Sequence, residues 1–60
     1  MVYLKTNRTG YSPEQVVHGT MTVGELINRL SDENPNDKIV FSNDEGYTYG
    51  AIYEDSIESD

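Results

Sequence analysis

The chain has 60 residues, and its 11 acidic side chains against four lysines and arginines give a net charge of −7. This length allows one small domain with a limited core, and the absence of cysteine excludes a disulfide framework and a thiolate zinc site. No apolar run reaches the ~20 residues of a membrane-spanning helix, so we expect a cytoplasmic protein.

Several segments have the composition of β-strands. Residues 2–6 and 38–42 are rich in apolar and β-branched side chains, and residues 16–20 are a further short candidate. Residues 47–53 alternate as a half-buried strand does. Turn-forming side chains at 43–46, with Gly46 able to adopt a positive φ, predict a hairpin between the last two strands.

A helix is predicted to begin at Thr22. Thr22 and Glu25 have the spacing of a capping box, in which each side chain accepts from the other residue's backbone N–H. Asn34 precedes Pro35, so the helix should end before residue 34. The apolar side chains that follow at helical spacing form one face, consisting of Val23, Leu26, Ile27 and Leu30.

Together these elements predict an α+β fold. We expect a small antiparallel β-sheet of three or four strands with one α-helix packed on one face. Residues 1–53 should form a single domain, followed by an acidic tail at 54–60 that is frayed and solvated.

Three tyrosines on one face of the last strand are candidate interface residues. Tyr47, Tyr49 and Tyr53 should form an aromatic row, with Tyr3 beside them. Such a row can stack nucleobases, anchor a protein interface or pack under the helix. Since one helix cannot cover both faces of a sheet, we expect a homo-oligomer, either a dimer or a tetramer, which also offsets the small core.

Charge is divided unevenly along the chain. Residues 1–20 carry two bases and one acid, for a net of +1, whereas residues 21–60 carry two bases and ten acids, for a net of −8. Lys5, Arg8 and His18 are therefore the candidates for holding a nucleic-acid phosphate. Glu14 is the one carboxylate among them and the candidate catalytic acid if the protein cleaves DNA, with Mg²⁺ as its cofactor.

The acidic remainder supports a different function. Many carboxylates on one small protein can bind the basic surface of a nucleic-acid-binding protein and compete with its nucleic acid. No catalytic motif is recognisable, and no other cofactor is evident, so the residues alone leave both an enzyme and a binding protein open.

Five segments together resemble a group of very small prophage-type proteins of gut bacteria. They are residues 3–7, 10–12, 21–26, 41–44 and 46–50. The branch of this group that the chain resembles is a type II-A anti-CRISPR family. The resemblance implies a sheet-and-helix fold that oligomerises in the cytoplasm of a bacterial host. It also implies a phage counter-defence function, the inhibition of an RNA-guided type II nuclease through the nicking or relaxation of supercoiled DNA. Negative supercoiling favours the R-loop that such a nuclease forms, so relaxed DNA is a poorer target.

Overall fold

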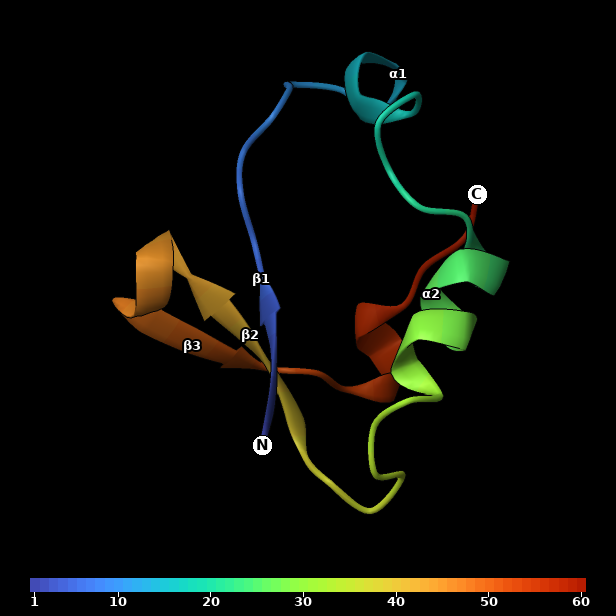
Figure 1. Ribbon diagram of the computed structural model, residues 1–60. Helices are drawn as coiled ribbons and strands as arrows, with labels where there is room; N and C mark the ends of the chain where they lie inside the picture. The colour runs from blue at the N-terminus through green and yellow to red at the C-terminus, as the bar shows by residue number, and fades with distance from the viewer. The chain divides into compact units, whose positions relative to one another are not determined.

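The computed structural model describes residues 1–60, and the chain divides into two compact units (Figure 1). The sheet unit consists of Met1–Asn7 and Lys38–Asp60, and the helix unit consists of Arg8–Asp37. The sheet unit is therefore made from two segments that lie far apart in the sequence.

The sheet unit contains three strands in the order β1-β2-β3. They are β1 (Val2–Lys5), β2 (Ile39–Asn43) and β3 (Thr48–Ala51). β1 pairs with β2 in parallel and β3 pairs with β2 in antiparallel orientation, so the sheet is mixed.

The predicted α+β class is confirmed, with two differences in the strands. The sheet is not wholly antiparallel, because the long connection between β1 and β2 allows a crossover and hence parallel pairing. Residues 16–20 form no strand. Pro13, whose fixed φ suits the first turn of a helix, instead begins a short helix in this region.

The helix unit contains α1 (Pro13–Val16) and α2 (Val23–Leu30). The predicted capping box at the start of α2 is confirmed. Thr22 Oγ1 accepts from the Glu25 N–H at 3.1 Å, and Glu25 Oε1 accepts from the Thr22 N–H at 3.0 Å. An ion pair of 2.8 Å joins Arg29, in the last turn of α2, to Glu33 beyond its end.

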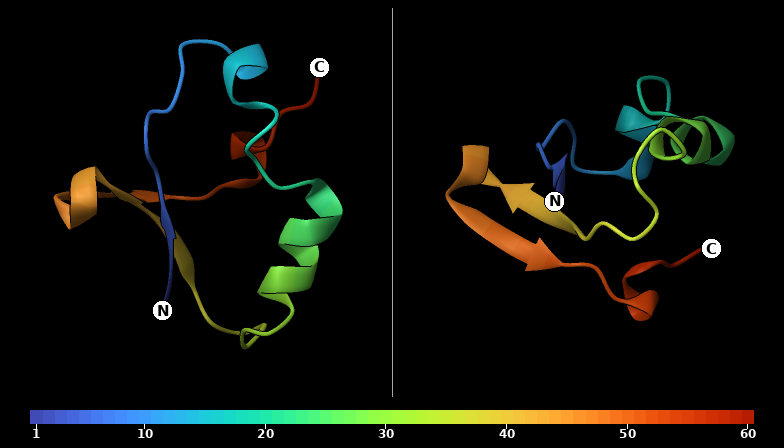
Figure 2. Two further views of the ribbon diagram at one scale, coloured as in Figure 1. Left: turned by 45° about the horizontal axis from the view of Figure 1, so that its top comes forward. Right: turned by 60° about the horizontal axis from the view of Figure 1, so that its bottom comes forward.

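Single turns of 3-10 helix flank β3. The turn η1 (Asp44–Gly46) connects β2 to β3, and the hairpin that they form is visible in both views of Figure 2. The turn η2 (Glu54–Ser56) follows β3 within the predicted acidic tail. There the Tyr53 N–H donates to Ser56 Oγ at 3.1 Å.

The two faces of the sheet differ in chemistry. Partners in the register share a face, so Leu4 lies beside Phe41 and Gly50, whereas Lys5 lies beside Ser42 and Tyr49. The aliphatic face is half-buried, and no apolar side chain anywhere in the chain is fully buried. The sheet therefore has little core of its own to stabilise it.

Replacing Thr22 with alanine should destabilise α2 by about 1 kcal/mol, because the N–H of Glu25 loses its acceptor. Urea unfolding followed by far-ultraviolet circular dichroism measures the effect. Thr20→Ala, in the loop before the cap, is the matched control and should leave the midpoint unchanged. Equal midpoints for the two variants would contradict the role of the cap.

The capping box should also make α2 sensitive to acid. Hydrogen bonding from the Thr22 backbone N–H lowers the pKa of Glu25 below its ordinary value. This contribution is complete above the ordinary glutamate pKa of about 4.3 and is lost as the pH falls through the lowered value. Circular dichroism across this range should show a smaller acid-induced loss of helix in Glu25→Gln than in the wild type. Glu14→Gln, outside the cap, should follow the wild type.

Candidate functional site

The second face of the sheet carries tyrosines in contact with one another. Tyr3 on β1 and Tyr49 on β3 face each other across β2, with ring centroids 5.9 Å apart and planes tilted by 52°. This distance is favourable for aromatic pairs. The rings are 55% and 60% exposed, so they form an accessible aromatic surface.

Two more tyrosines lie at the ends of β3. Tyr47 is 85% exposed and Tyr53 is 67% exposed. The predicted row placed both on the strand itself, but Tyr47 has helical backbone angles at the end of η1, and Tyr53 precedes η2. Within the strands, Tyr49 contacts Tyr3, which the sequence places beside the row.

Carboxylates bracket this strand at both ends. Asp44 and Glu45 lie in η1, Glu54 and Asp55 lie in η2, and all four residues are exposed. No lysine, arginine or histidine occurs after Lys38. We call the surface formed by η1, β3 and η2 the acid–tyrosine surface; its residues are Asp44, Glu45, Tyr47, Tyr49, Tyr53, Glu54 and Asp55.

The turn that presents the first two carboxylates has an unusual backbone. Gly46 has a φ of 91°, as its sequence position predicts, but Asp44 and Glu45 also have positive φ values, 49° and 57°. A side chain in this region costs roughly 1–2 kcal/mol. The sequence does not predict a positive φ at Glu45, because glutamate is not a residue that favours this conformation.

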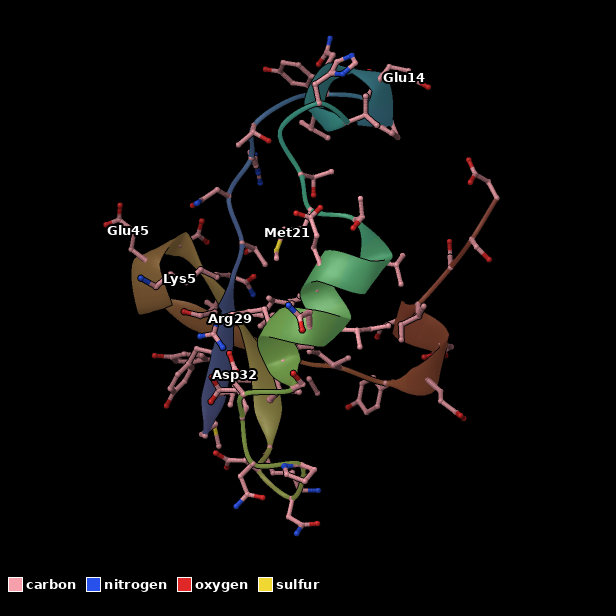
Figure 3. The ribbon with its side chains drawn as sticks, turned by 45° about the vertical axis from the view of Figure 1, so that its right-hand side comes forward. Lys5, Glu14, Met21, Arg29, Asp32 and Glu45 are labelled. Atoms are coloured by element: carbon pink, nitrogen blue, oxygen red, sulfur yellow. The ribbon has the colours of Figure 1, made fainter.

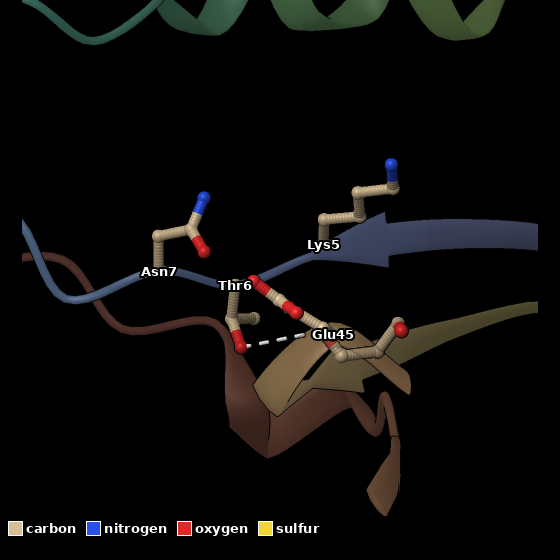
Figure 4. A pocket seen from close by; sticks show the side chains of 5 residues that line it. Lys5, Thr6, Asn7 and Glu45 are labelled. Atoms are coloured by element: carbon tan, nitrogen blue, oxygen red, sulfur yellow. Dashed lines mark hydrogen bonds between the residues drawn. The ribbon is translucent and has the colours of Figure 1, made fainter. Parts of the chain in front are cut away.

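A shallow open pocket of about 410 Å³ lies within the sheet unit (Figure 4). Its lining residues are Lys5, Thr6, Asn7, Ser42 and Glu45. They lie at or just beyond the carboxyl ends of the parallel strands β1 and β2, a common position for ligand sites. With a lysine and a glutamate at its rim, the pocket can accept a small polar group.

Thr6 holds one wall of this pocket. Its hydroxyl donates to Asn43 Oδ1 at 2.7 Å, with a longer contact of 3.4 Å to the Ser42 carbonyl oxygen. Its backbone N–H donates to that same carbonyl at 3.0 Å. These bonds fix the end of β1 against the end of β2.

The residues predicted to act on DNA are divided between the two units. Glu14 lies on α1 and points outward from it (Figure 3). Arg8 and His18 belong to the same helix unit, whereas Lys5 belongs to the sheet unit. Arg8 also lines a second open pocket, of about 500 Å³, with Thr9, Gly10 and Tyr11.

The residues around Glu14 do not supply a metal-ligand set. No three side chains drawn from His18 and the aspartates and glutamates lie close enough together to hold a metal ion. Mg²⁺ takes six oxygen ligands, so Glu14 alone would leave the other five positions to waters and substrate phosphate. The expectation of Mg²⁺ at Glu14 therefore stays a prediction without support from the donor geometry.

No family model, curated protein or solved structure matches this chain. None of its helices is long and apolar enough to span a bilayer. The chemistry of the exposed side chains, together with the sequence resemblance, is therefore the basis for a functional proposal.

Replacing Glu45 with glycine should stabilise the sheet unit by up to about 1 kcal/mol, because glycine adopts a positive φ without strain. Gly46→Ala should have the opposite effect, since alanine at a φ of 91° is strained and its Cβ lies 3.4 Å from the Tyr49 hydroxyl. Thermal unfolding of the two variants measures both changes. Equal shifts of the same sign would contradict the left-handed turn.

Proposed function

We propose that the protein is a phage counter-defence inhibitor that binds an RNA-guided type II nuclease through the acid–tyrosine surface. The partner site is a basic groove of the nuclease that otherwise holds nucleic acid. In this mechanism the inhibitor occupies the groove and cleaves nothing.

The observation that carries this proposal is the arrangement of carboxylates and tyrosines along β3. Arginine side chains form bidentate hydrogen bonds with carboxylates and stack on aromatic rings. Asp44 and Glu45 precede Tyr49 in η1, and Glu54 and Asp55 follow it in η2. Both kinds of contact are therefore offered along β3 and its two flanking turns. A nucleic acid offers a basic protein the same two contacts, since its phosphates accept hydrogen bonds as carboxylates do and its bases stack as aromatic rings do.

The charge of the surface selects a basic protein over DNA as partner. Binding to DNA depends on neutralising phosphates with lysine and arginine. From residue 39 onward the chain has six acids and no base, so DNA is repelled there. The nuclease type comes from the sequence resemblance, and its heteroduplex channel is positively charged.

The same resemblance also implies the nicking of supercoiled DNA by an oligomer. In that mechanism Glu14 is the catalytic acid, and Lys5, Arg8 and His18 hold the phosphate. Placement of Arg8, Glu14 and His18 in one unit is the observation in its favour. A nicking assay separates the two mechanisms.

Binding to a purified nuclease–guide RNA complex should depend on the carboxylates that bracket β3. We expect Asp44→Asn with Glu45→Gln to weaken binding about tenfold, which corresponds to the loss of two exposed charge pairs. Surface plasmon resonance at several salt concentrations measures it, and wild-type affinity should fall as salt rises. Glu58→Gln with Asp60→Asn removes the same charge beyond the surface and is the matched control. Equal loss in both variants would indicate a net-charge effect only.

Supercoiled plasmid incubated with Mg²⁺ tests the alternative. The binding mechanism leaves the plasmid supercoiled with wild-type protein and with Glu14→Gln alike. Open-circular product from the wild type, and none from Glu14→Gln, would replace the binding mechanism with nicking.

A further inference from the structure

The three-stranded sheet has two edge strands, β1 and β3. An edge strand presents backbone N–H and C=O groups that can pair with another chain. Neither strand contains a proline that would block such pairing.

The backbone groups on the free side of β1 belong to Tyr3 and Lys5. The N–H groups of Val2 and Thr6 donate inward, to the carbonyl oxygens of Lys38 and Ser42 at 2.8 and 3.0 Å. Because the inward and outward groups alternate along a strand, those of Tyr3 and Lys5 point away from β2.

On β3 the outward groups belong to Tyr49 and Ala51. The backbone carbonyls of Lys38 and Ser42 accept hydrogen bonds from β1. Backbone groups of successive residues point to opposite sides of a strand, so those of Phe41 point toward β3 and bond with its partner Gly50. The neighbours of Gly50 on either side, Tyr49 and Ala51, therefore direct their backbone groups away from the sheet.

The two edges have opposite charge. The first ten residues hold Lys5 and Arg8 and no acid. β3 is bracketed by the acidic turns η1 and η2. Two β1 edges, or two β3 edges, bring like charges together, whereas β1 against β3 brings opposite charges together.

We propose that copies of this protein join head to tail, with the β1 edge of one copy paired antiparallel to the β3 edge of the next. Placing Tyr3 opposite Ala51 and Lys5 opposite Tyr49 pairs the outward groups of both strands. Each of these pairs exchanges two backbone hydrogen bonds.

The same register matches the side chains on both faces. Lys5 comes to lie across from the ring of Tyr49, a favourable position for an ammonium group. On the aliphatic face, Val2 lies across from Ile52 and Leu4 across from Gly50, where no side chain competes for space.

Because the paired edges differ, the contact is heterologous and extends until a ring closes or a filament grows. The pairing places Lys5 of the next copy beside Tyr49, a residue of the acid–tyrosine surface, but its backbone bonds form between copies of this chain and need no nuclease. The further inference therefore stands or falls separately from the proposed function.

Proline variants test the pairing edge by edge. Lys5→Pro removes an outward N–H of β1, and Ala51→Pro removes an outward N–H of β3, without removing an N–H that bonds within the sheet. We expect the wild type to sediment as an assembly and each variant to sediment at the 6.8 kDa of one chain. Lys5→Ala and Ala51→Ser, which keep the N–H, are the controls and should still assemble through backbone bonds.

An equimolar mixture of the two proline variants is the decisive measurement. Each variant retains the edge that the other lacks, so the mixture should form a one-to-one dimer of twice the chain mass. A mixture that stays at one chain mass, a monomeric wild type, or an Ala51→Pro variant that assembles like the wild type would overturn the proposal.

Amide hydrogen exchange of the wild type keeps the test valid if a proline variant fails to fold. The N–H groups of Tyr3, Lys5, Tyr49 and Ala51 should be protected at high protein concentration and exchange on dilution. Protection of Tyr3 and Lys5 alone would indicate pairing between two β1 edges and would overturn the head-to-tail arrangement.

Discussion

The parallel pairing of β1 with β2 is the interaction on which the sheet unit depends. Without it, β2 and β3 are an isolated two-stranded hairpin, which is marginally stable at best in water. The pairing is reinforced where β1 ends, because Thr6 bonds to Ser42 and Asn43 through both its backbone and its hydroxyl. The contact of Tyr3 with Tyr49 and the pocket beside Lys5 exist only because β1 occupies this position.

A shortage of buried apolar surface is the second constraint on the molecule. Thirteen residues are valine, leucine, isoleucine or phenylalanine, yet none is fully buried. Burial of one such side chain contributes about 1.5–3 kcal/mol, so partial exposure leaves much of this stabilisation unrealised. Contacts with a second chain, of either the same or a different protein, are a direct way to gain it.

Local signals in the sequence predicted local structure well. Thr22 and Glu25 lie three residues apart and define the start of α2 by themselves, and Gly46 marks the turn because glycine tolerates a positive φ. The direction of β1 could not be predicted in the same way, since a strand pattern is identical for parallel and antiparallel partners. Positive φ at Asp44 and Glu45 is imposed by closure of the hairpin, and the meeting of Tyr3 with Tyr49 depends on the register of three strands.

The order of the strands along the chain has a consequence for biosynthesis. Thr6 and its partner Ser42 are 36 residues apart, so β1 leaves the ribosome well before the strand that it pairs with. The β2–β3 hairpin closes across a single turn, and short loops close faster and at less entropic cost than long ones. We therefore expect the nascent chain to hold β1 unpaired until the hairpin residues 39–51 have been made. During that interval the unpaired β1 can instead pair with the hairpin of a neighbouring chain whose synthesis is further advanced.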